Sequence, residues 1–110
     1  MLLRRFDRVR VLIDDSEFAQ LVGSIVKGTL QNLVTSGGAR GECAELRLDV
    51  PLKVGERLVT SVLALPRHKG YGFHRWGIRS VAVYLVPLSN GQNSELARER
   101  PFALGLLSKG

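Results

Sequence analysis

Residues 66–79, PRHKGYGFHRWGIR, combine aromatic rings, cations and glycines in one short stretch. The stretch contains Tyr71, Phe73 and Trp76, both histidines of the chain and no acidic residue. Flat rings stack on nucleic-acid bases, each stack contributing about 1–3 kcal/mol, and cationic side chains neutralise phosphates. Glycines let the backbone bend and approach a ligand closely. The pattern predicts a binding loop for single-stranded nucleic acid.

The distribution of charge supports an anionic partner. The 110 residues carry a formal net charge of +6, and no acidic residue lies between Glu56 and Glu95. A strongly basic segment of this kind is typical of proteins that bind nucleic acid. We therefore expect the strands at 57–65 and 77–86 to present a basic face. The predicted nucleic-acid-binding residues are Lys27, Arg57, Arg67, Lys69, Tyr71, Phe73, His74, Arg75, Trp76 and Arg79.

Catalytic and metal-binding patterns find little support in the chain. His68 and His74 lack the spacing of a metal site, and Cys43 lies in an alternating apolar segment that predicts a small buried side chain. We therefore predict no enzymatic activity, no metal and no cofactor. A lone cysteine favours a reducing compartment, and no segment approaches the roughly 18 apolar residues of a membrane span. The expected location is the cytoplasm, without membrane contact.

The hydrophobic pattern predicts one all-β domain over residues 1–110. Period-two alternation or short apolar runs indicate five strands, at 8–13, 21–34, 43–50, 57–65 and 77–88. A short helix is expected after Asp14, because Asp and Ser favour the first position of a helix. Another is expected up to Arg100 and should end there, because the residue preceding a proline disfavours helical backbone. We expect a small β-barrel with its core at about 18–88, a basic N-terminal strand or arm at 1–13 and a short C-terminal helix or tail at 89–110.

The segment from Leu21 to Leu48 resembles the first hairpin of bacterial single-stranded DNA-binding proteins and of the primosomal replication protein PriB. Leu21-Val22-Gly23 and Gly37-Gly38-Ala39 stand at the spacing of that family, and residues 77–88 resemble its last strand. The resemblance implies a five-stranded OB-fold whose basic aromatic loop joins the last two strands. It also implies sequence-tolerant binding of single-stranded DNA or RNA in replication or recombination, by a homodimer or higher homo-oligomer.

Two other resemblances compete. The chain is similar to PilZ domains, which bind cyclic di-GMP, in an Arg-x-x-x-Arg pattern at Arg4 and Arg8. The later Asp/Asn-x-Ser-x-x-Gly pattern is met by Asn32 and Gly37, with Val34 in place of the serine. KGYGFHRW also resembles an RNA-recognition motif, although no partner motif precedes it. Trp76 has two interpretations, a ring that faces a ligand or a plug in the barrel.

Overall fold

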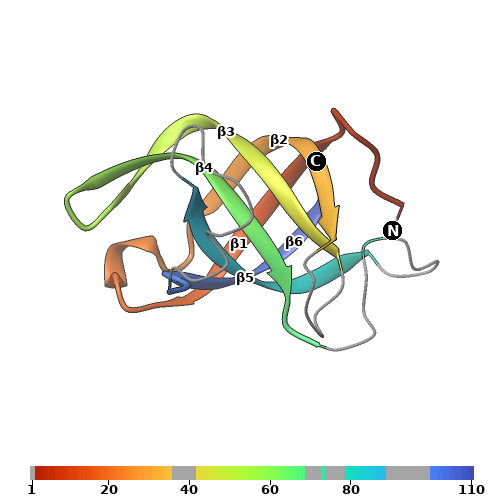
Figure 1. The fold of residues 1–110 in the computed structure, drawn as a ribbon. Helices are drawn as coiled ribbons and strands as arrows, with labels where there is room; N and C mark the ends of the chain where they lie inside the picture. Colours follow the sequence, from red (N-terminus) through yellow and green to blue (C-terminus); the bar gives the residue numbers. More distant parts are fainter. Residues whose placement is uncertain (1, 36–41, 69–72, 74–78, 89–99) are drawn as a thin grey trace.

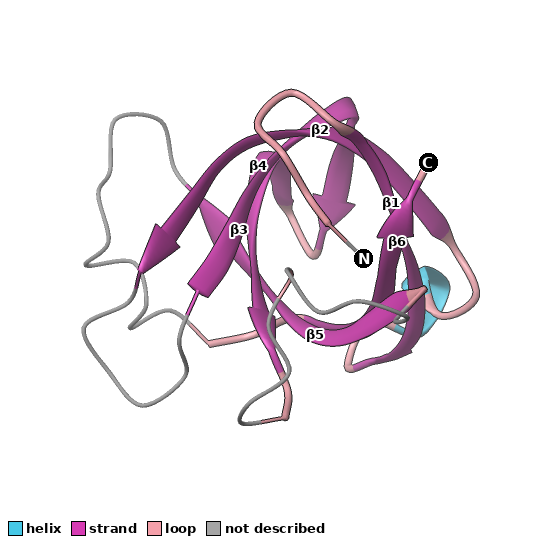
Figure 2. Ribbon diagram, turned by 90° about the vertical axis from the view of Figure 1, so that its right-hand side faces the viewer, coloured by secondary structure: helices cyan, strands magenta, loops and turns pink. Residues whose placement is uncertain are grey.

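Six antiparallel strands form a closed barrel in the computed structural model, and each strand pairs with its neighbours along the chain. The strands β1 and β6 pair with each other and close the ring (Figures 1 and 2). The structure describes residues 2–35, 42–68, 73, 79–88 and 100–110. The strands are β1 (Arg8–Ser16), β2 (Ile25–Thr35), β3 (Glu42–Val54), β4 (Arg57–Pro66), β5 (Ser80–Leu88) and β6 (Ala103–Lys109).

Alternating side chains explain why these segments pair as strands around one core. In β1, Val9, Val11 and Ile13 are buried, whereas Arg8 before them and Arg10 between Val9 and Val11 are exposed. Successive side chains of a strand point to opposite faces, so a charged–apolar alternation lines the inside of a barrel with apolar groups. The main core cluster draws residues from all six strands and includes Leu30, Leu46, Val62, Val83 and Leu107.

Bulges and glycines let the sheet curve into a closed ring. The register shifts between Ile13 and Asp15 on β1 and again between Leu30 and Asn32 on β2, and such bulges bend a strand and increase its twist. On β6, a Cβ at Gly105 would lie 2.6 Å from Val11 Cγ1 and 2.7 Å from the Leu12 carbonyl oxygen. Only glycine therefore allows β6 to approach β1 this closely.

The barrel confirms the all-β prediction and corrects its finer form. It has six strands rather than five, and its strand order follows the sequence, whereas the OB-fold is a Greek-key barrel of five strands. The missed strand is β6, which pairs with both β1 and β5. The barrel therefore spans residues 8–109 rather than 18–88, because the expected N-terminal arm and C-terminal tail supply the two strands that close it. The loop at 66–79 joins β4 and β5, which are not the last two strands.

The structure describes only one of the two segments for which the sequence predicts a helix. The helix expected after Asp14 is limited to one 3₁₀ turn, η1 (Ala19–Leu21), because β1 continues to Ser16. The Ser16 hydroxyl donates to the Phe102 carbonyl at 2.6 Å and accepts from the Phe18 N–H at 3.0 Å, which fixes the end of the strand. The helix expected before Pro101 falls at 89–99, outside the described residues. In the part of the chain that the structure describes, no helix is long and apolar enough to cross a membrane.

Candidate anion-binding site at the N-terminal turn

The aromatic loop predicted from the sequence is described only in part. Phe73 is fully buried in the main core, and its carbonyl oxygen accepts a hydrogen bond from the Leu3 N–H at 3.4 Å. A ring in that position packs against protein and cannot stack on a ligand without leaving the core. Five further predicted residues lie outside the described residues, namely Lys69, Tyr71, His74, Arg75 and Trp76.

The remaining predicted cations are dispersed. Arg57 begins β4 and Arg79 precedes β5, and both are exposed. Arg67 is half-buried, with Nη1 3.9 Å from Asp14 Oδ2 and its guanidinium carbon 6.0 Å from the centre of the Tyr84 ring. These contacts place Arg67 in a local ion pair and ring contact at the end of β4.

The basic face expected on β4 and β5 is not present in the described parts of those strands. Arg57 is the one cation that β4 and β5 contribute. The two strands instead contribute Leu63, Leu65 and Val86 to a second apolar cluster with Cys43 of β3, against which Tyr84 and Leu88 pack. The burial of Cys43 confirms the prediction of a small buried side chain. Strong local charge in the sequence therefore does not become a basic surface on these two strands.

A turn at the N-terminus, which we call the arginine turn (Arg4–Asp7), is held in place by its own hydrogen bonds and by β2. The Asp7 N–H donates to the Arg4 carbonyl at 3.0 Å, and the Arg4 N–H donates to the Asp7 carboxylate at 2.8 Å. That bond from Arg4 holds the pKa of Asp7 below its usual value, and Lys109 at 3.4 Å acts in the same direction. The Phe6 N–H donates to the Leu30 carbonyl at 2.7 Å, so the turn lies against the bulged part of β2.

Phe6 is the unusual residue of the arginine turn. Its φ is 74°, it is the one non-glycine residue of the described chain with positive φ, and its side chain is 63% exposed. A bulky side chain rarely adopts left-handed backbone, and such strain concentrates at ligand sites. The Arg5 guanidinium carbon lies 4.9 Å from the ring centre, and Arg5 Nε donates to the Gln31 carbonyl at 3.0 Å. The result is an exposed ring with a cation fixed against it.

Next to the arginine turn, three cations of β1 and β2 line a basic hollow of about 250 Å³ that is made by Arg8, Arg10, Lys27, Val9 and Gly110. Arg10 and Lys27 are direct cross-strand partners, and like charges in that relation repel each other. Arg8 makes a bidentate pair with Asp49, which raises the pKa of Arg8 and lowers that of Asp49, and it also donates to the Thr29 hydroxyl at 2.9 Å. An anion bound here would relieve the repulsion between Arg10 and Lys27.

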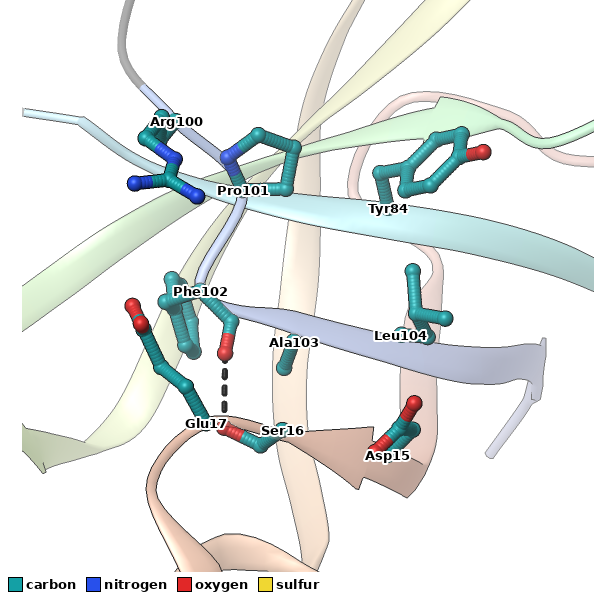
Figure 3. A pocket seen from close by; sticks show the side chains of 9 residues that line it. All are labelled: Asp15, Ser16, Glu17, Tyr84, Arg100, Pro101, Phe102, Ala103 and Leu104. Carbon is teal, nitrogen blue, oxygen red and sulfur yellow. Dashed lines mark hydrogen bonds between the residues drawn. The ribbon is translucent and has the colours of Figure 1, made fainter.

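The opposite end of β1 has a different character. A shallow groove of about 400 Å³ lies between the end of β1 and β6, with Tyr84 and Arg100 at its rim (Figure 3). Asp15 and Glu17 place two carboxylates along it. Carboxylates at this end repel phosphate groups, so the basic hollow and the arginine turn are the better place for an anionic ligand.

Comparisons with protein-family models, with curated proteins and with solved structures find no match for this chain. The described residues contain no group of three or more histidine, cysteine or acidic side chains that could hold a metal ion. The candidate site therefore rests on its own geometry. Sequence reasoning assigned Lys27 to an anion site and left open a second site at Arg4, Arg5 and Arg8, but it missed Phe6 and Arg10. The aromatic ring set among cations in RRFDR was the signal that could have identified the turn.

Proposed function

We propose that this chain is a nucleotide-binding module whose ligand is a cyclic dinucleotide such as cyclic di-GMP. The observation that carries the proposal is the exposed, strained Phe6 ring with the Arg5 guanidinium fixed beside it. A base can stack on such a ring, and the neighbouring guanidinium groups can bind phosphate or the edge of guanine. In this proposal Phe6 and Arg5 bind a base, while Arg4 and Arg8 bind the phosphodiesters, for which Arg8 exchanges its pair with Asp49 for a phosphate oxygen.

The position of the turn supports the same ligand class. The resemblance to PilZ domains requires Arg4 and Arg8 to lie near the strand that carries Asn32, more than twenty residues later in the sequence. The Phe6 N–H bonds Leu30, the Leu30 N–H bonds the Asp7 carbonyl at 2.9 Å, and Asn32 is exposed two residues further along β2. The N-terminal turn therefore lies near Asn32, the one residue of the second half that both fits the pattern and is described. Gly37 lies outside the described residues, and Val34 departs from the pattern.

The test is an isothermal calorimetric titration of the purified chain with cyclic di-GMP at two salt concentrations. We expect saturable binding that Arg4→Ala weakens by about tenfold or more, because a charge-assisted hydrogen bond contributes about 1.5–3 kcal/mol. Arg100→Ala is the matched control, since Arg100 is also an exposed arginine but lies in the groove at the far end of β1. Equal losses in both variants, or no binding by the wild type, would contradict the proposal.

Sequence-tolerant binding of single-stranded DNA is the second candidate, and the same exposed ring among cations favours it. Fluorescently labelled oligo-dT, titrated beside duplex DNA, separates the two ligands. The log of the association constant for oligo-dT should fall with log salt at about 0.7 per phosphate contacted, so a strand that covers several phosphates gives a steep slope. A cyclic dinucleotide has only two phosphodiesters, so the association constant for cyclic di-GMP should depend weakly on salt. Tight, salt-sensitive binding of oligo-dT with no response to cyclic di-GMP would select this candidate.

A further inference from the structure

One outer face of the barrel exposes a continuous apolar stripe. Leu12 of β1 pairs with Ile25 of β2 on one side and with Leu106 of β6 on the other. These side chains are 41%, 56% and 37% exposed. Val50, which is 73% exposed, lines a hollow with Ile25 and extends the stripe onto β3. A run of large apolar side chains across four neighbouring strands is typical of an interaction surface.

Charge changes sign across this stripe along β1. In sequence order, the exposed side chains of β1 are Arg8, Arg10, Leu12, Asp14 and Asp15. Two cations therefore precede the central leucine, and two acids follow it. The Asp15 carboxylate lies at the surface beside Leu104 of β6 (Figure 3). On β6, Arg10 pairs with Ser108, Leu12 with Leu106 and Asp15 with Leu104. The bulge after Ile13 therefore places Arg10 and Asp15 at similar distances on either side of Leu12, because each β6 partner lies two residues from Leu106.

This order of charges is complementary to itself. When two copies meet with their β1 strands antiparallel and crossed at Leu12, a two-fold axis along the stripe places Arg10 of one copy opposite Asp15 of the other. The same operation repeats the pair on the other side of the axis, as an isologous interface requires. The apolar stripes then cover each other at the centre, and the charged pairs lie at the rim.

We propose that the β6–β1–β2 face is a homodimer interface, with a second copy of this chain as its occupant. Leu12, Ile25 and Leu106 form the apolar centre, and Arg10 pairs with Asp15 of the second copy. The inference rests on the exposed stripe and on the charge order along β1. Because Arg10 also lines the basic hollow, an anion bound there competes with Asp15 of the second copy, and the experiments below are made without nucleotide.

Sedimentation equilibrium over a range of concentrations tests the apolar centre. We expect a reversible dimer, and Leu12→Ser with Ile25→Ser should raise its dissociation constant at least about tenfold, because each lost apolar contact weakens the centre. Leu58→Ser is the matched control, since Leu58 is 72% exposed on β4, two strands from β2 around the ring. Circular dichroism melting checks that every variant is folded. A wild type that stays monomeric into the millimolar range overturns the proposal, as does a dimer that the double variant leaves unchanged.

Charge reversal gives a sharper test that does not depend on lost burial. Arg10→Asp alone and Asp15→Arg alone should each weaken self-association, because each places like charges at both rim contacts. An equimolar mixture of the two variants should recover the dimer, since both contacts then join an acid to a cation. The double variant Arg10→Asp with Asp15→Arg should recover it as well. A mixture that remains monomeric while both variants are folded would overturn this orientation of the two copies.

Discussion

At the residue scale, the most informative position is Phe6, where conformation and exposure conflict with ordinary packing. An exposed phenylalanine contributes little to stability, and left-handed backbone costs an L-residue about 1–2 kcal/mol. The hydrogen bond from the Phe6 N–H to Leu30 and the Arg4–Asp7 bonds hold the backbone in place. Stability alone does not account for a ring at this position, which is why we assign it to ligand binding.

Phe6→Asn should separate binding from stability. Asparagine tolerates left-handed backbone, so the free energy of unfolding should stay unchanged or rise by up to about 1 kcal/mol. Affinity for the nucleotide should fall by the value of one base stack, about 1–3 kcal/mol. Urea denaturation and calorimetry on the same sample measure both quantities. A variant that loses stability but retains full affinity would show that the ring has a structural role.

The lowered pKa of Asp7 predicts how the free energy of unfolding depends on pH. Its pKa is lowered in the folded state by the Arg4 N–H, relative to about 3.9 in the unfolded chain. Its stabilising contribution is therefore present above about pH 4 and is lost as the pH falls through the lowered folded value. The difference in unfolding free energy between wild type and Asp7→Asn should be largest near neutral pH and shrink as the pH falls below about 4. Denaturant titrations across this range test it, and a constant difference would contradict it.

At the scale of elements, β6 is the strand that closes the sheet into a barrel. It pairs with β1 over Ala103–Lys109 and with β5 over Ala103–Ser108, so it joins the two ends of the sheet. Its burial alternates, with Leu107 fully buried and Leu106 partly exposed. A sheet of the first five strands would leave two unpaired edges, and closure removes both.

Two neighbouring leucines of β6 provide a matched pair of substitutions that tests which face of the strand points into the core. Leu107→Ala should lower the free energy of unfolding by about 2–5 kcal/mol, because it leaves a cavity in the core. Leu106→Ala should cost less than about 1 kcal/mol, since that side chain points outward. Chemical denaturation at low protein concentration, where self-association does not contribute, gives both values. Equal costs would mean that the register of β6 differs from the one described.

At the scale of the whole molecule, the segments outside the strands complete the core. Leu3 and Phe73 are both fully buried and belong to the same core cluster as the strands, and the Leu3 N–H bonds the Phe73 carbonyl. The N-terminal segment and one residue of the β4–β5 connection are thus packed together against the barrel. Phe73 resembles the plug considered for Trp76, which lies outside the described residues.

Phe73→Ala should therefore destabilise the whole fold. The expected loss is about 3–5 kcal/mol in the free energy of unfolding, the usual cost of removing a buried phenylalanine ring. Phe6→Ala is the matched control: it removes the same ring from an exposed position and should cost less than about 1 kcal/mol. If Phe73→Ala were nearly neutral for stability but weakened binding of oligo-dT, the ring would belong to the ligand site predicted from the sequence.

The sequence by itself determined the all-β class and most of the strand positions. The alternation in RVRVLI and CAELRLDV requires strands with one apolar face, whatever the fold around them, because side chains on a strand alternate between its two faces. The sequence also determined the formal net charge of +6, which does not depend on how the strands pair. ALGLLSK at the end of the chain alternates more weakly, and its local pattern does not by itself predict a strand.

Only the tertiary structure decided how these parts combine. Strand order, the closure of β1 on β6 and the approach of the arginine turn to Gln31 join residues far apart in sequence, and local pattern does not encode such pairings. Which side chains are buried also depends on contacts between residues far apart in the sequence. Phe73 and Phe6 are both phenylalanines close to glycine or cations in the sequence, yet one is fully buried and the other is 63% exposed. The physical reason is that burial depends on what packs against a ring, which is settled only when the barrel closes.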